Sequence, residues 1–121
     1  MKTQPALQSF HRRLRPSKYH NVRVQADGYT FDSKAEGRRY QQLKVLVQQG
    51  AIEDLAVHPK YPLVVNGLKV ATYIGDFSYR KADSSQVIVE DVKGTILPVY
   101  RLKKRLIHAI YGIEIQEVAA R

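Results

Sequence analysis

The fold of this chain is decided by the stretch YIGDFSYRKADSSQVIVEDVKG, which spans residues 73–94. Both of its ends are apolar runs with the character of strands, and residues 80–86 between them have the composition of a turn. If this hairpin turns about Asp83-Ser84, residues whose numbers sum to 167 face each other. Asp76 then lies opposite Asp91, so the stretch predicts a hairpin that brings two carboxylates together.

Two opposed carboxylates need a cation. Residues opposite each other on antiparallel strands have Cβ atoms about 4.5–5.5 Å apart, and like charges at that distance repel. Because side chains alternate along a strand, Lys93 shares the face of Asp91, while Glu90 points to the other face and is expected to be structural. The combination indicates metal-dependent chemistry on a phosphate.

The elements on either side predict an α/β (α+β) fold with a mixed sheet flanked by helices. A capping box formed by Ser33 and Glu36 predicts a helix over residues 33–49, which Gly50 ends. Asp27-Gly28 and Asn66-Gly67 are hairpin turn signals. The expected strands are 21–25, 29–31, 52–57, 63–65, one long strand 68–79, 87–92 as a central strand, and 113–118; a second helix spans about 97–111 with Pro98 in its first turn and Gly112 at its end.

The second helix has two kinds of side. Apolar residues form one side, namely Val99, Leu102, Leu106, Ala109 and Ile110, and basic ones the other, namely Arg101, Lys104, Arg105 and His108. The basic side is either a solvated surface or, since the helix begins shortly after Lys93, a contact for phosphates. Tyr100 and Lys103 are either substrate contacts or packing residues.

The charge distribution indicates a polyanionic partner. The net charge is +9 and the pI is about 9.9, which favours nucleic acid, the alternative being a merely basic surface. Six basic residues precede the first acid, Asp27; they are Lys2, Arg12, Arg13, Arg15, Lys18 and Arg23. We therefore expect a basic arm over residues 1–18 that grips DNA phosphates, followed by a single domain over residues 19–121.

Several classes of protein are excluded or disfavoured. The chain has no cysteine, so it forms neither disulfides nor zinc–thiolate sites. No apolar stretch is long enough to cross a membrane, and a cytoplasmic location is expected, the host cytoplasm if a phage encodes the protein. The four histidines have no metal-ligand spacing, and His58 before Pro59 is expected to end a strand.

Asp76, Asp91-Val92-Lys93 and the helical Glu36 together resemble the PD-(D/E)XK nuclease superfamily. More specifically, residues 28–36 and 89–94 resemble a family of short, phage-type endonucleases, and the similarity runs over about residues 18–118. Gly75 stands where that superfamily often has proline. The resemblance implies a restriction-endonuclease-like αβββαβ core.

The resemblance also implies a Mg²⁺- or Mn²⁺-dependent endodeoxyribonuclease. Asp76, Asp91, Glu36 and the carbonyl of Val92 would hold the ion, and Lys93 would stabilise the nucleophile or the charge on the phosphate. The capping box explains Glu36 equally well without any chemistry. The residues expected to contact DNA are Arg12, Arg13, Arg15, Lys18, Arg101, Lys103, Lys104 and Arg105.

The implied substrate is branched DNA, such as a Holliday junction, processed in phage-type recombination. A homodimer is expected because cutting both strands usually takes two active sites. Three alternatives stay open: a non-catalytic DNA-binding scaffold, a subunit of a recombination or transposition complex that cuts only with its partners, and a ribonuclease.

Overall fold

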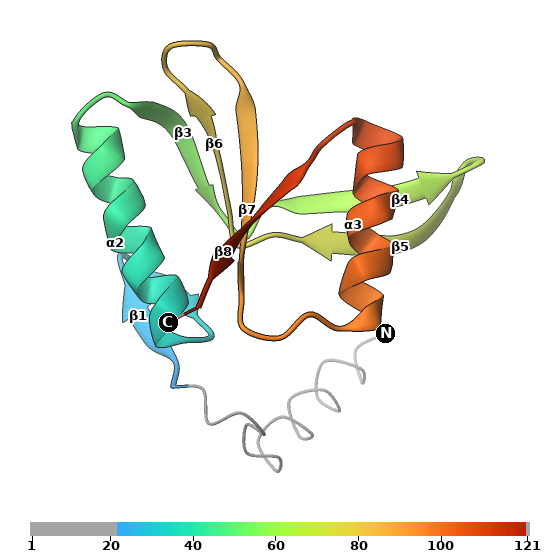
Figure 1. Ribbon diagram of the computed structural model, residues 1–121, viewed down its shortest axis with the longest axis horizontal. Coiled ribbons are helices and arrows are strands. Elements are labelled where there is room, and N and C mark those ends of the chain that lie inside the picture. Colours follow the sequence, from blue (N-terminus) through green and yellow to red (C-terminus); the bar gives the residue numbers. More distant parts are fainter. Residues whose placement is uncertain (1–21, 121) are drawn as a thin grey trace.

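The computed structural model describes residues 22–120 (Figure 1). The elements, in chain order, are β1 (Val24–Ala26), β2 (Tyr29–Phe31), α2 (Lys34–Gln48), β3 (Ile52–Val57), β4 (Lys60–Val65), β5 (Leu68–Ile74), β6 (Phe77–Lys81), β7 (Val87–Lys93), α3 (Pro98–Tyr111) and β8 (Ile115–Ala119). The expected basic arm with Arg12, Arg13, Arg15 and Lys18 lies outside the described residues. Within residues 22–120, no helix is long and apolar enough to cross a membrane.

The central sheet is mixed, as predicted. Its strand order is β3-β6-β7-β8, with β7 antiparallel to β6 and parallel to β8. A parallel pair needs a crossover connection, and α3 provides it between β7 and β8 (Figure 1). The strand that carries Asp91 is therefore held on both of its edges, which fixes the position of its side chains.

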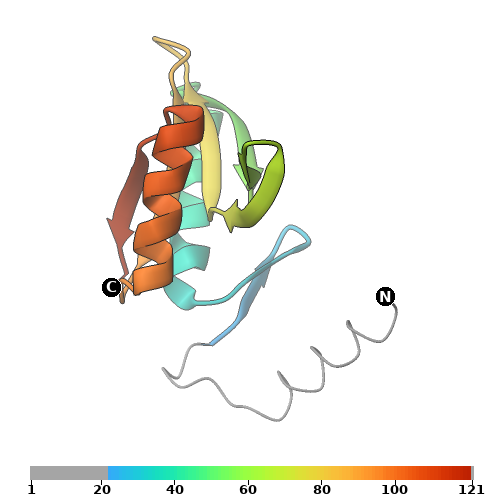
Figure 2. The same ribbon diagram turned by 90° about the vertical axis from the view of Figure 1, so that its right-hand side faces the viewer.

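The two helices cover opposite faces of this sheet. Figure 2 shows α3 in front of the strands and α2 behind them. Alternation along β7 sends Ile88 into the core beneath α2 and Val89 into the core beneath α3. The first core also holds Phe31, Tyr40, Leu43, Ile52, Phe77 and Tyr79, and the second Leu63, Tyr73, Tyr100, Ile107 and Ile115.

Local signals produce the turns and caps as predicted. The Oγ of Ser33 accepts a hydrogen bond from the N–H of Glu36 at 3.2 Å and so caps α2. Gly50 has a φ of 76°, the left-handed conformation that ends helices. Both residues of Asp27-Gly28 and of Asn66-Gly67 have positive φ, as two-residue hairpin turns of type I′ require.

The prediction of one long strand over residues 68–79 is wrong. The strand breaks at Gly75-Asp76, and β5 leaves the central sheet to pair with β4 in a separate two-stranded sheet. A Cβ at Gly75 would lie 3.2 Å from Val89 Cγ1, so a larger residue here would have to displace Val89 by a few tenths of an ångström. Opposite the break, His58 donates its N–H to the Asp76 carbonyl, and Gly75 donates to Pro59. The chain therefore bends at the same level between β3 and β4 and between β5 and β6.

The apolar side of α3 does not form its buried face. Val99 and Leu102 are 63% and 58% exposed, whereas Tyr100 and Ile107 are buried against β4 and β5. The helix thus faces the sheets with the sector that lies between its apolar and its basic residues. Smaller differences concern strand ends: β4 begins at Lys60 rather than at residue 63, and β8 spans 115–119 rather than 113–118.

Candidate metal centre

The hairpin follows the predicted sum of 167 as far as Phe77 and Glu90, and Asp76 and Asp91 are the next residues beyond this pair. In the pairing of β6 with β7, Phe77 faces Glu90, and every pair has this sum. The N–H of Asp76 donates at 3.0 Å to the carbonyl of Glu90, which already pairs with Phe77, so the regular pairing ends at this point. Asp91 is only 5% exposed. The hairpin thus brings one nearly buried carboxylate beside a second one at the end of a strand.

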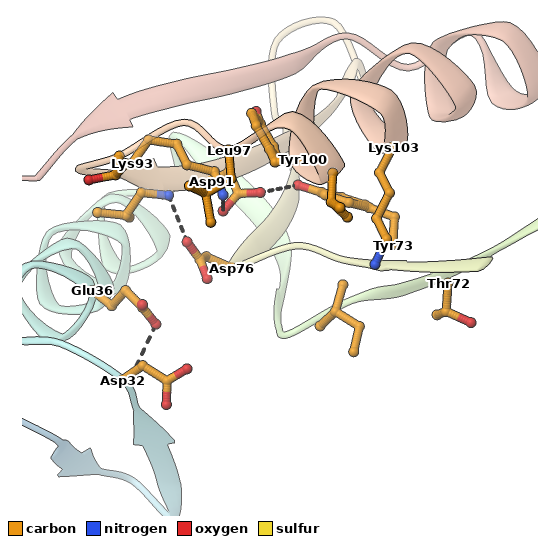
Figure 3. A pocket seen from close by; sticks show the side chains of 14 residues that line it. Asp32, Glu36, Thr72, Tyr73, Asp76, Asp91, Lys93, Leu97, Tyr100 and Lys103 are labelled. Carbon is orange, nitrogen blue, oxygen red and sulfur yellow. Dashed lines mark hydrogen bonds and ion pairs between the residues drawn. The ribbon is translucent and has the colours of Figure 1, made fainter. Parts of the chain in front are cut away.

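Hydrogen bonds fix both carboxylates (Figure 3). Asp76 Oδ2 accepts from the backbone N–H of Val92 at 2.6 Å, and Asp91 Oδ2 accepts from the Tyr73 hydroxyl at 2.5 Å. The N–H and C=O of one strand residue point to the same side, so the Val92 carbonyl also faces Asp76. This carbonyl can therefore join the two carboxylates as an oxygen donor.

Lys93 lies on the Asp91 side of this group. Its Nζ is 3.4 Å from Asp91 Oδ1 and 3.8 Å from the centre of the Tyr100 ring. The carboxylate and the aromatic face hold the ammonium at the edge of the acids, where a phosphate that approaches them would meet it. Tyr100 in turn donates to Glu117 on β8, so its role here is to position Lys93.

Glu36 reaches the same place from the first turn of α2. Its Oε1 accepts from the N–H of Asp32 at 3.4 Å, whereas the reciprocal bond of a capping box would go to Ser33. One oxygen of Glu36 and one of Asp76 lie within 4.8 Å of each other, together with a ring nitrogen of His58. The structure thus brings Glu36 to Asp76, and capping does not account for its whole environment.

The electrostatics of the centre favour a cation. Burial, followed by the charge of Glu36, raises the pKa of Asp76 to about 8. Burial also raises the pKa of Glu36, with Asp32 as the next cause. Carboxylates that are buried together hold on to their protons unless a cation compensates their charge. Three carboxylates and a carbonyl form an oxygen donor set that suits Mg²⁺ or Mn²⁺.

An open cleft of about 430 Å³ lies over the acids. Residues from α2, β5, β7 and α3 line it, including Glu36, Asp76, Asp91, Lys93, Thr95 and Lys103. Lys103 extends from α3 toward the strand that carries Thr72 and Tyr73 (Figure 3). A phosphate-bearing chain that enters this cleft would therefore lie between the acids and a second ammonium.

The other basic residues of α3 have different environments. Lys104 forms an ion pair with Glu117 on β8 at 2.8 Å, so its charge is already compensated. Arg101 and Arg105 are exposed on the outer side of the helix and do not line the cleft. Of the four residues expected to contact DNA on α3, Lys103 is therefore the one that the structure brings to the acids.

Glu90 is structural, as the alternation of β7 predicts. It is fully buried on the α2 face, where Arg39 binds it with two hydrogen bonds of 2.8 and 2.6 Å and the Tyr79 hydroxyl donates a third. Consecutive acids on β7 thus serve two purposes. Glu90 fastens the strand to α2, which carries Glu36, and Asp91 faces the cleft.

Sequence reasoning missed His58, whose signal was present. Counting back from Asn66-Gly67 as the turn pairs residue 57 with Asp76, since those numbers sum to 133. A one-residue irregularity between Leu63 and Val64 raises the sum to 134 and brings His58 opposite Asp76. Spacing along the chain alone pairs the wrong residue with Asp76, because the irregularity that shifts the register to His58 is not visible in the sequence.

Comparison with curated proteins and with solved structures found no match for the chain. A family model described as "Protein of unknown function (DUF1064)" matches residues 16–118, which include all residues of the centre. The chain therefore belongs to the DUF1064 family.

Proposed function

We propose that this protein is a metal-dependent endodeoxyribonuclease of the PD-(D/E)XK type. The observation that supports this best is that the β6–β7 hairpin brings the carboxyl groups of Asp76 and Asp91 together just beyond its last pair, while Lys93 lies 3.4 Å from Asp91 Oδ1. An arrangement of two acids and an adjacent ammonium in an open cleft suits attack on a phosphodiester.

The residues have distinct roles in the proposed reaction. Asp76, Asp91, Glu36 and the Val92 carbonyl would hold Mg²⁺ or Mn²⁺, which when bound supplies a water of lowered pKa and offsets charge on the phosphate. Tyr73 orients Asp91 by donating to its Oδ2. Lys93 donates to the attacking oxygen or to a phosphate oxygen as negative charge develops there.

The proposed substrate is DNA, with a preference for branched forms such as Holliday junctions. The net charge of +9 favours a polyanion. Lys103 lines the cleft, and the same helix carries Arg101 and Arg105 outside it. A DNA backbone that extends from the acids across α3 would therefore meet these basic side chains. Contacts of this kind are made to phosphates, and they recognise the shape of DNA rather than its sequence.

Cleavage assays with labelled linear, single-stranded and four-way-junction DNA test the proposal. The wild type is expected to cut DNA in Mg²⁺ or Mn²⁺, whereas Asp91→Ala and Lys93→Ala should bind but not cut. Lys69→Ala is the matched control, because Lys69 is exposed on β5 and does not line the cleft. Ca²⁺ should support binding without turnover.

The alternatives predict different results in the same assays. Cutting that persists in EDTA or in both cleft variants would refute the assigned site. Binding without cutting by the wild type on every DNA would favour the scaffold, or a subunit that needs its partners. An RNA substrate in the same series tests the ribonuclease alternative, and the oligomeric state in solution tests the expected homodimer.

A further inference from the structure

His58 is held next to Asp76 by backbone geometry. It connects β3 to β4 in the left-handed conformation, with a φ of 55°, and its N–H donates to the Asp76 carbonyl at 2.9 Å. The Phe31 ring packs against the imidazole at 5.9 Å between centroids. A residue other than glycine rarely adopts this φ, and histidine is among the few that do so more often. The bend thus holds the imidazole beside Phe31 and within reach of Asp76 and Glu36.

The donor atoms of three side chains converge at this point. One ring nitrogen of His58 and one oxygen each of Glu36 and Asp76 lie within 4.8 Å of one another, and all three residues are half-buried. Ligands at about 2.1 Å from a divalent ion lie at most about 4.2 Å apart. Cis ligands of the same ion are about 3.0 Å apart, so side-chain rotations that shift the three atoms by about 1 Å would bring them into one coordination sphere.

The chemistry of this group differs from that of an all-oxygen site. Mg²⁺ takes oxygen ligands in a strict octahedron and keeps several waters. Imidazole nitrogen suits first-row transition ions, whose affinity for such sites rises from Mn²⁺ towards copper. A nitrogen among carboxylates therefore favours a transition ion over Mg²⁺.

We propose that His58 is a metal ligand, together with Glu36 and Asp76, and that it makes the centre selective for a divalent first-row transition ion over Mg²⁺. This inference rests on the proposed metal-dependent function and specifies its cofactor. Asp76 is shared between His58 and Glu36 on one side and Asp91 on the other, so the imidazole acts on the same ion that the nuclease would use.

The test is metal binding by the purified protein without DNA. Titration calorimetry with Mn²⁺ and Mg²⁺, and the electron paramagnetic resonance of bound Mn²⁺, should be compared for the wild type and for His58→Asn. Asparagine also tolerates the left-handed conformation, so the bend is retained. His108→Ala is the matched control, because His108 is exposed on α3.

We expect His58→Asn to weaken Mn²⁺ binding by at least about tenfold, since changes to groups that only support metal ligands already cost that much. Mg²⁺ binding should change far less, and His108→Ala should change neither. Unchanged Mn²⁺ affinity in His58→Asn would overturn the inference, as would an equal loss for both ions. DNA cleavage is measured separately. Selective Mn²⁺ binding without DNA cleavage would reject the nuclease proposal but support His58 as a metal ligand. DNA cleavage with metal binding that does not depend on His58 would support the nuclease and reject His58 as a ligand.

Discussion

Replacing Asp76 by Asn should remove a large loss of stability that the metal-free protein suffers as the pH rises. Burial, and then the charge of Glu36, raises the pKa of Asp76 from its ordinary value of 3.8 to about 8. Below pH 3.8 the carboxyl is protonated in both the folded and the unfolded chain, so it costs no stability there. Above this pH only the unfolded chain releases the proton freely, so the free energy of unfolding falls until the pH passes about 8.

The size of the effect follows from this interval. From pH 3.8 to pH 7 is about three pH units, and at 1.36 kcal/mol each the wild type should lose about 4 kcal/mol relative to Asp76→Asn. The amide oxygen of the variant can still accept from the N–H of Val92, as Asp76 does at 2.6 Å. Charge rather than packing therefore dominates the difference between the two proteins.

Urea unfolding in EDTA at pH 4, 5.5 and 7 measures this difference. With a slope of about 2 kcal/mol per molar urea, 4 kcal/mol corresponds to midpoints about 2 M further apart at pH 7 than at pH 4. Titrating groups that do not interact with Asp76 are common to both proteins and cancel in the comparison. A difference between the two urea midpoints that is the same at pH 4 and at pH 7 would refute the reasoning. Saturating Mn²⁺ should restore the wild type at pH 7 and leave the variant unchanged.

Two further predictions concern the fastening of β7 and the basic arm. Arg39→Met should destabilise the protein by about 3–5 kcal/mol, because it leaves the fully buried Glu90 without its partner. Adding Glu90→Gln should recover much of this, and a double-mutant cycle by urea unfolding that shows independent effects would contradict the pairing. Deleting residues 1–18 should weaken DNA binding and flatten its salt dependence, by about 0.9 in the logarithmic slope for each phosphate that the arm neutralises. A slope that is the same in the truncated and full-length proteins would mean that the arm does not bind DNA.

The sequence could predict those parts of the fold that depend on neighbours along the chain. Asn66-Gly67 needs only its own backbone preferences to form a tight turn, and Ser33 caps α2 with a residue three positions away. The same holds for the pairing of β6 with β7, in which the numbers of paired residues sum to 167. A short polar turn between two apolar runs leaves this register little freedom to slip. Asp76, Asp91 and Lys93 follow from that register.

Contacts between distant segments decided the rest. The break at Gly75-Asp76 depends on how closely β5 passes Val89, and no pattern within residues 68–79 reports that distance. The orientation of α3 also depends on segments that are distant in the sequence. Its apolar periodicity is genuine, but the surface offered by β4 and β5 selects Tyr100 and Ile107 for burial instead.

By itself, the sequence determined which acids come together at the end of the hairpin, because a hairpin register is local. Only the tertiary structure decided what surrounds them. Glu36 arrives on a helix and His58 across a bent hairpin, while Arg39 binds Glu90 from the other face of the sheet. These partners come from two separate segments, α2 and the β3–β4 connection, and their distances depend on how helices pack on a twisted sheet rather than on spacing along the chain.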